Sequence, residues 1–149
     1  MLWTLLKASQ SSTSNLYMWG GGTSGQLGDG SIISKSSPVQ IGDISDWAQI
    51  SAGNKYSLSL KTDVTLWACG LGTSGQLGDG STTTKSLPVQ IGALTNWSKV
   101  SAGTAFALAV KTNGTLWAWG SNSSGQLGLN LATSANRSSP VQVGTETNW

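Results

Sequence analysis

The chain repeats itself about every fifty residues, and this period restricts its possible folds more than any other feature. SAGNKYSLSLKTDVTLWACG at 51–70 aligns with SAGTAFALAVKTNGTLWAWG at 101–120. SPVQIGDISDW at 37–47 recurs as LPVQIGALTNW at 87–97 and as SPVQVGTETNW at 139–149. A period near fifty is typical of one blade of a β-propeller and unlike helical or leucine-rich repeats.

We divide the chain into a single repeat domain, 1–149, with three units. The units are 1–50, 51–100 and 101–149, and residues 1–15 have diverged from the repeat. Only 9% of the residues are charged, while Gly, Ser and Thr are frequent and there are eight Trp. Few charges, many turn formers and large flat side chains favour an all-β protein. We therefore expect propeller-type blades of short antiparallel strands.

Each unit shows the alternation of a β-strand and a hairpin turn. In FALAV, the large residues Phe106, Leu108 and Val110 alternate with alanine, which is the period of a strand. Asn113–Gly114 then predicts a type I′ turn with positive φ at both residues. The second unit has Asp63–Val64 at this place. A β-branched residue disfavours positive φ, so we expect a looser hairpin or another turn type there.

Proline marks the last strand of each unit. Pro38, Pro88 and Pro140 each open a short PVQ(I/V) segment. Because proline has no N–H to donate, we expect these strands at the outer edge of their sheets.

A Gly-rich loop follows the Trp-containing strand in every unit. TSGQLGDGS occurs at 23–31 and 73–81, and SSGQLG occurs at 123–128. Such a loop can cradle a phosphate, but no P-loop lysine and no following helix accompany it. One ligand would not need three equivalent cradles, so we interpret the loop as a structural turn, with Gly at unusual φ and Gln capping the backbone. The residues are Gly25, Gln26, Gly28, Gly75, Gln76, Gly78, Gly125, Gln126 and Gly128.

Taken together, residues 16–149 resemble the repeats of the regulator of chromosome condensation family. The shared pattern is AG, then a G-x-L-W-x-W-G strand, then GQLG. The resemblance implies a propeller of four-stranded blades. Where that family usually has His after AG, this chain has Tyr56 and Phe106. The near-identical units joined by SPVQIG are similar to repeats of large bacterial and phage proteins.

The chemistry-bearing residues are few. With no His and a single Cys, serine and cysteine triads and His-metal sites are excluded. Asp29 and Asp79 occupy equivalent positions in LGDGS, so we interpret them as turn residues. We expect no enzyme and no catalytic, cofactor or metal site.

Charge and hydrophobicity also limit the partners. Eight basic and six acidic residues show no cluster of either sign, so we expect no nucleic-acid partner. The apolar run at the N-terminus is too short for a signal peptide or for crossing a membrane.

The tryptophans recur with the units. We expect Trp67 and Trp117 to pack between blades, with Tyr17 at the same position, and also Trp19 and Trp119. Cys69 stands at the position of Trp19 and Trp119, as a small buried hydrophobic residue. The remaining repeated tryptophans precede the SAG strand, and we favour packing over a carbohydrate- or partner-stacking surface for them. They are Trp47, Trp97 and Trp149.

Three units are fewer than the four to eight blades of closed propellers. We therefore expect other protein chains to complete or cap the array: a second copy, a different protein or a larger parent. Because Trp3 lies outside the repeat pattern, we expect Trp3, Leu5 and Leu6 to lie in such an interface.

Three functions remain open. The first is a non-enzymatic structural or adhesion module of a phage virion or cell surface, which docks through loop faces. The second, which the family resemblance implies, is a regulator of a small GTPase or a chromatin-associated protein. The third is a glycan-binding propeller. We favour the first, and a virion or extracellular location, because of the low charge and the repetition.

Overall fold

A computed structural model describes residues 4–5, 14–43, 45–131 and 135–149. These residues form eleven strands and no helix. In chain order the strands are β1 (Thr4–Leu5), β2 (Leu16–Gly20), β3 (Lys35–Ile41), β4 (Trp47–Ala52), β5 (Tyr56–Lys61), β6 (Leu66–Gly70), β7 (Lys85–Gln90), β8 (Trp97–Ala102), β9 (Phe106–Lys111), β10 (Leu116–Gly120) and β11 (Arg137–Val143). The chain is all-β, as the sequence predicts.

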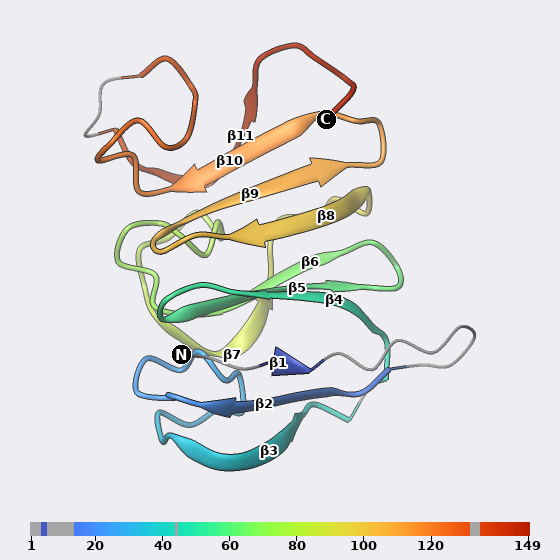
Figure 1. The fold of residues 1–149 in the computed structure, drawn as a ribbon, viewed down its shortest axis with the longest axis vertical. Helices are drawn as coiled ribbons and strands as arrows, with labels where there is room; N and C mark the ends of the chain where they lie inside the picture. Colours follow the sequence, from blue (N-terminus) through green and yellow to red (C-terminus); the bar gives the residue numbers. More distant parts are fainter. Residues whose placement is uncertain (1–3, 6–13, 44, 132–134) are drawn as a thin grey trace.

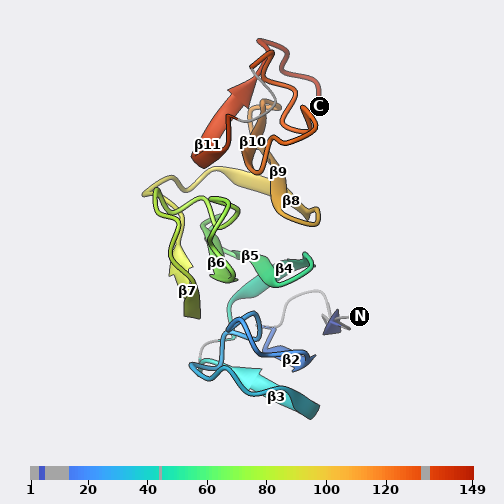
Figure 2. The same ribbon diagram turned by 90° about the vertical axis from the view of Figure 1, so that its left-hand side faces the viewer.

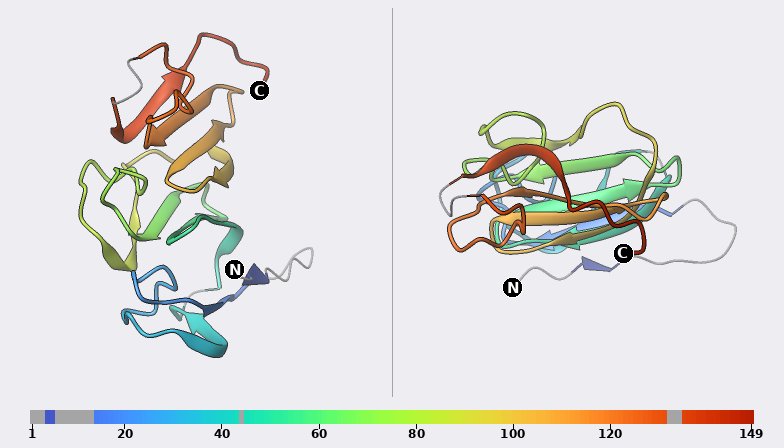
Figure 3. Two further views of the ribbon diagram at one scale, coloured as in Figure 1. Left: turned by 60° about the vertical axis from the view of Figure 1, so that its left-hand side comes forward. Right: turned by 90° about the horizontal axis from the view of Figure 1, so that it is seen from above.

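The strands build three antiparallel sheets. The first has the order β1-β2-β3, the second β4-β5-β6-β7 and the third β8-β9-β10-β11. The sheets follow one another along the long axis of the molecule, with the first and third at opposite ends (Figures 1 and 2). Viewed along that axis they overlie one another (Figure 3, right). Three successive blades of this kind form part of a propeller.

The second and third sheets begin at Trp47 and Trp97, ahead of Ser51 and Ser101 where we start the sequence units. The strand that opens each sheet therefore belongs partly to the preceding sequence unit. In the first sheet, β1 takes the place next to β2, pairing Thr4 with Met18 and Leu5 with Tyr17. The described part of the chain contains no helix long and apolar enough to cross a membrane.

The proline-containing strands β3, β7 and β11 lie at sheet edges, as predicted. They begin earlier than the prolines, at Lys35, Lys85 and Arg137. An irregularity in the pairing, for example between Ala68 and Gly70 on β6, separates these first residues from the regular PVQ pairing. The missing N–H of proline costs nothing at an edge, because no further strand needs that donor.

The turn between β9 and β10 corrects our type I′ prediction. Gly114 has φ +79°, whereas Asn113 does not have positive φ. The amide of Gly114 donates to Lys111 O at 2.9 Å, and Lys111 N donates to Thr115 O at 3.0 Å. This is a three-residue hairpin loop in which a type I turn is followed by one left-handed residue.

The equivalent turn between β5 and β6 has the same form, so our expectation of a looser or different turn was wrong. Val64 takes the left-handed position with φ +59°, and its amide donates to Lys61 O at 3.0 Å. Asp63 Oδ1 accepts bonds from the amide and the hydroxyl of Thr65, as Asn113 does from Thr115. These side-chain bonds hold the turn although valine disfavours this φ.

Alternation along the strands divides each sheet into two faces. Leu58, Leu60 and Leu66 of the second sheet face the third sheet and are buried in one cluster with its Trp97 and Trp119. A second cluster joins the first and second sheets and contains Leu16, Met18, Leu27, Ile41 and Trp47. The hydrophobic core therefore lies between the sheets, and each sheet depends on its neighbours for burial.

Candidate functional site

The three Gly-rich loops share one backbone conformation. Gly25 and Gly28 both have φ +72°, and Gly28 N donates to Gly25 O at 3.0 Å. The side chain of Gln26 turns back, and its Oε1 accepts a bond from Ser24 N at 2.8 Å. Gln76 and Gln126 bind Ser74 N and Ser124 N at the same distance. The loops and the β4–β5 and β8–β9 turns gather on one side of the stack, at the left in Figure 1.

Each of the first two loops docks on the sheet that follows it. The main-chain carbonyl of Gln26 accepts a hydrogen bond from Ser57 Oγ at 2.8 Å, and Cys69 Sγ lies 3.6 Å away. The carbonyl of Gln76 accepts a bond from Trp119 Nε1 at 3.0 Å. Cys69 and Trp119 occupy equivalent positions on β6 and β10. Both junctions between neighbouring sheets therefore use the carbonyl of the loop glutamine and the equivalent strand of the next sheet.

Glycine is required in these loops because the next sheet approaches closely. A Cβ on Gly78 would lie 2.6 Å from Trp119 Nε1, and one on Gly28 would lie 3.1 Å from Cys69 Sγ. The first distance leaves no room for a side chain, and the second would require Cys69 Sγ to shift by a few tenths of an ångström. Farther along, Gly30 N donates to Ser86 O at 2.9 Å and Gly80 N donates to Ser138 O at 2.8 Å.

Among the described residues, no sheet follows the third loop. A Cβ on Gly125 would have no atom within 4 Å, whereas one on Gly25 or Gly75 would clash with the main chain of the next sheet. Gly125 and Gly128 are exposed and Gln126 is half-buried, while the equivalent residues of the first two loops are buried. At the other end, Trp19 is half-buried, although Cys69 and Trp119 are buried.

A lysine lies over paired tryptophans at each junction. Lys61 Nζ is 4.5 Å from the ring centroid of Trp67 and 5.0 Å from that of Trp47. It also forms an ion pair with Asp46 at 3.2 Å. The two rings meet edge to face with centroids 6.3 Å apart. The cation and the rings attract each other because the ring faces are electron-rich.

The junction of the second and third sheets has no carboxylate at the position of Asp46. Lys111 Nζ lies 3.5 Å from the ring centroid of Trp117 and 5.0 Å from that of Trp97. Asn96 replaces Asp46, and its Oδ1 is buried without a hydrogen-bond partner. Lys111 is only 6% exposed, and this burial lowers the pKa of its ammonium group. A buried ammonium therefore depends on ring faces alone for compensation.

The tryptophans that begin the opening strands β4 and β8 lie inside the stack and are not available as stacking surfaces. Trp47 and Trp97 are buried between sheets, whereas Trp149 is 56% exposed. Trp67 and Trp117 are half-buried, and each indole N–H donates to a threonine hydroxyl two residues earlier. Of the residues predicted to form an interface, Trp3 and Leu6 lie outside the described residues. Leu5 is described only as part of β1.

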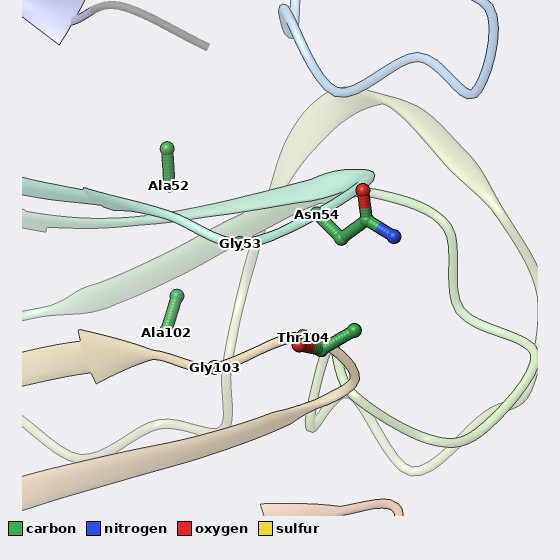
Figure 4. A pocket seen from close by; sticks show the side chains of 6 residues that line it. All are labelled: Ala52, Gly53, Asn54, Ala102, Gly103 and Thr104. Carbon is green, nitrogen blue, oxygen red and sulfur yellow. The ribbon is translucent and has the colours of Figure 1, made fainter. Parts of the chain in front are cut away.

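The residues that line the surface hollows offer few groups for catalysis or ligand binding. A shallow hollow of about 500 Å³ lies between the β4–β5 and β8–β9 turns, lined by Ala52, Gly53, Asn54, Ala102, Gly103 and Thr104. The two alanines point the same way, and Asn54 and Thr104 lie at the turn tips (Figure 4). A second hollow of about 210 Å³ contains Asp79, but this carboxylate already accepts bonds from Ser81 and pairs with Lys85 at 3.8 Å.

The remaining reactive groups are held in structural roles. Burial, with a smaller contribution from Asp29, raises the pKa of the Cys69 thiol to about 12, so it is protonated at neutral pH. Asp29 accepts bonds from Ser31 and pairs with Lys35 at 3.2 Å, as Asp79 does with Ser81 and Lys85. Within the described ranges, no three His, Cys, Asp or Glu side chains gather as metal ligands.

Sequence reasoning missed a set of exposed apolar side chains. Ile32 and Ile33, each 64% exposed, lie in the loop between β2 and β3, and Leu87 on β7 is 59% exposed. A Cβ added to Gly30 would lie 3.4 Å from Leu87 Cδ2, so Leu87 lies beside the loop between β2 and β3. We call Ile32, Ile33 and Leu87 the outer loop patch. The signal was present in the repeat: the first unit has SIIS where the second has STTT.

Comparison with solved structures places the chain among propellers. It matches yeast RCC1 (Prp20), in a crystal structure bound to Kap60, with 24% identity and a TM-score of 0.76, covering 88% of this chain and 33% of that one. Prp20p from Saccharomyces cerevisiae, in a structure reported with its binding properties to Gsp1p and histones, matches at 22% identity and a TM-score of 0.77, covering 95% and 38%. Human WBSCR16 matches at 26% identity and a TM-score of 0.74, covering 93% and 36%.

The chain thus spans roughly a third of the length of these proteins. No match was found among curated protein sequences. The family model for the regulator of chromosome condensation (RCC1) repeat matches three times, at residues 14–60, 65–110 and 113–148, and a second model of this repeat matches 97–126. Because these matches cover most of the chain and recur three times, as the sheets do, the protein belongs to the family of regulator of chromosome condensation (RCC1) repeat proteins.

Proposed function

We propose that the chain is a non-enzymatic protein-interaction module that binds a partner protein through the outer loop patch. The observation that carries the proposal is the exposure of Ile32 and Ile33, side by side on a loop that is otherwise well ordered by hydrogen bonds. Two neighbouring isoleucines in water are unfavourable unless a partner covers them, because burying each side chain is worth about 1.5–3 kcal/mol.

The character of the patch favours a protein over other partners. It consists of aliphatic side chains, which offer neither the flat aromatic faces on which sugars stack nor the charges that nucleic acids need. Of the three tryptophans that a glycan-binding surface would use, Trp47 and Trp97 are buried between the sheets, whereas Trp149 is exposed. Yeast RCC1 (Prp20), whose structure is similar, is bound to a protein, Kap60, in its crystal structure, and this supports a protein partner.

The absence of enzymatic activity is supported by the state of the candidate groups. The Cys69 thiol is buried and protonated, and the turn carboxylates Asp29 and Asp79 are each engaged by serine and lysine. A nucleophile or a general base needs access to a substrate and a suitable pKa. Neither condition is met by these groups.

The experiment first identifies the partner and then measures its affinity. A photocrosslinking amino acid at position 33 captures bound proteins in an extract of the source organism. Calorimetric titration of the captured protein then compares the wild type with the double variant Ile32→Thr, Ile33→Thr. Threonine is compatible with this loop because Thr82 and Thr83 occupy the equivalent positions in the second unit. Leu131→Thr, also on an exposed loop but in the third unit, is the matched control.

We expect the double variant to bind at least about tenfold more weakly and the control to bind as the wild type does. Unchanged affinity of the double variant would contradict the proposed surface. Specific binding on a glycan array, or accelerated nucleotide release from a small GTPase, would favour the glycan-binding or exchange-factor alternatives instead.

We also propose that the module belongs to a virion or a cell surface. The low charge and the repetition of near-identical units support this location. Quantitative mass spectrometry of purified particles and surface fractions tests it, and recovery of the protein only in the cytosolic fraction would contradict it.

A further inference from the structure

We propose that the junction of the second and third sheets binds a small, weakly hydrated anion such as chloride, held by the ammonium group of Lys111 and the indole N–H of Trp97. The inference goes beyond the proposed function and does not involve the outer loop patch. Trp97 belongs to the buried cluster between these two sheets, so the site lies inside the stack.

The two junctions between neighbouring sheets are built alike. Lys61 and Lys111 occupy equivalent positions, and each lies over two tryptophan rings. In both pairs the rings meet edge to face, with centroids 6.1–6.3 Å apart. Each junction therefore serves as an internal reference for the other.

At the junction of the first and second sheets, a carboxylate balances the ammonium charge. Lys61 Nζ lies 3.2 Å from Asp46 Oδ2. The backbone holds the acid beside the lysine, because Thr62 N donates to Asp46 O at 2.7 Å. The attraction of the opposite charge offsets part of the free energy that a cation loses on leaving water.

The junction of the second and third sheets keeps this backbone geometry but not the negative charge. Thr112 N donates to Asn96 O at 2.8 Å, so the Asn96 side chain stands in the place of the Asp46 carboxylate. Asn96 is neutral, and Lys111 Nζ lies only 3.5 Å from the ring centroid of Trp117. The replacement of one residue thus removes the opposite charge, while the lysine and the rings remain.

No other acidic residue of the sequence takes over this task. All six Asp and Glu residues lie in the described ranges, and none of them forms an ion pair with Lys111. Lys111 is only 6% exposed, and burial lowers the pKa of its ammonium group. A cation in such surroundings is stabilised by any anion that can reach it.

Trp97 offers a second donor at the same place. Its indole Nε1 is buried and has no hydrogen-bond partner among the described residues. Lys111 Nζ lies 5.0 Å from the centroid of this ring. The edge of an aromatic ring is its positive side, and a buried N–H without a partner is costly. An anion at this edge would bind both donors. Rotation of the Asn96 amide would also turn an N–H group into the place of its buried, unpaired Oδ1.

The surroundings favour a small halide over other anions. A hollow of about 210 Å³ borders the rings of Trp97 and Trp117 and gives a small ion access to the junction. Asp79 also lines this hollow, but it pairs with Lys85 at 3.8 Å. Because the ion must leave water to reach buried groups, strongly hydrated fluoride and sulfate should bind less well than chloride or bromide.

The first experiment measures urea unfolding of the whole chain while sodium chloride replaces sodium fluoride at constant ionic strength. One site in the folded state lowers the unfolding constant about tenfold when chloride reaches about nine times its dissociation constant. We expect such a decrease for the wild type. Asn96→Asp is the matched control, because it places a carboxylate beside Lys111 as Asp46 lies beside Lys61. Its unfolding constant should not respond to the exchange of halides.

Two further variants separate the site from a general effect of salt. Asp46→Asn gives the first junction the composition of the second, so its unfolding constant should fall more steeply with chloride than that of the wild type. Lys111→Met keeps an unbranched side chain without the charge and should abolish the chloride response. Equal responses of the wild type and Asn96→Asp would overturn the proposal.

Bromide locates the ion directly. In crystals grown with sodium bromide, we expect an anomalous scattering peak beside Lys111 Nζ and Trp97 Nε1 in the wild type and none there in Asn96→Asp. No peak at this place, or a peak without a chloride response in solution, which would mean an adventitious ion only, would contradict the proposal. The variant Ile32→Thr, Ile33→Thr should keep the chloride response, so this proposal and the proposed function fail separately.

Discussion

The main-chain carbonyl of Gln76 accepts a hydrogen bond from the indole Nε1 of Trp119, 3.0 Å away across the junction of the second and third sheets. The bond joins residues 43 positions apart and binds a turn of one blade to the core strand of the next. Because a Cβ on Gly78 would lie 2.6 Å from the same nitrogen, the turn's glycine and the indole depend on each other. The repeated loop therefore acts as the connector between blades.

Two substitutions of Trp119 should destabilise the stack by different amounts. Trp119→Phe keeps a ring but leaves the buried Gln76 carbonyl without its donor, so we expect a loss of about 1–3 kcal/mol. Trp119→Ala also leaves a cavity in the core cluster, so we expect a loss of about 3–5 kcal/mol. Urea unfolding measures both, and unchanged stability of Trp119→Phe would show that the hydrogen bond contributes nothing.

A residue that tolerates positive φ at the left-handed position of the β5–β6 turn should stabilise the protein. Val64 has φ +59°, which β-branched residues disfavour, so Val64→Asn should raise the free energy of unfolding by about 0.5–1 kcal/mol. Val64→Ile keeps the branching and should leave stability unchanged. In the third sheet, Gly114→Val should lower stability, since a Cβ there would lie 2.0 Å from Thr147 O. A lower melting temperature for Val64→Asn would contradict the strain argument.

A carboxylate introduced beside Lys111 should increase the free energy of unfolding. Asn96→Asp places a carboxylate where Asp46 pairs with Lys61, so we expect a gain of about 0.5–1 kcal/mol in unfolding free energy. Asp46→Asn should cause a loss of similar size at the other junction. Chemical denaturation checks both variants. Unchanged or lower stability of Asn96→Asp would contradict the restored ion pair.

One turn should contribute to acid sensitivity. Hydrogen bonds from the hydroxyl and the amide of Thr65, with Lys61 nearby, lower the pKa of Asp63 below its ordinary 3.8 despite partial desolvation. The stabilisation is complete above pH 3.8 and is lost as the pH falls through the lowered pKa. Asp63→Asn should keep stability at neutral pH, because Asn113 makes the same bonds in the third sheet. Its unfolding free energy should fall less steeply below pH 4 than that of the wild type, and identical pH profiles would contradict this role of Asp63.

Much of the fold follows from the sequence by itself. The fifty-residue period predicts repeated blades, the alternation in FALAV predicts strands, and Pro88 and Pro140 mark edge strands because proline cannot donate to a further strand. The loop glycines were recognisable because the turn recurs with the repeat. These features are local: they depend on the backbone preferences of a few neighbouring residues.

Other features were decided only by tertiary structure. The turn at Asn113–Gly114 adopts a three-residue form that the dipeptide alone does not distinguish from type I′. Val64 accepts an unfavourable φ because Asp63 and Thr65 hold the turn. Burial also cannot be read from the repeat: Gly75 and Gly125 occupy identical GQLG motifs, yet one is covered by the next sheet and the other is exposed. The physical reason is that a blade buries its faces only against its neighbours, so equal sequences at the middle and at the end of the stack have different surroundings.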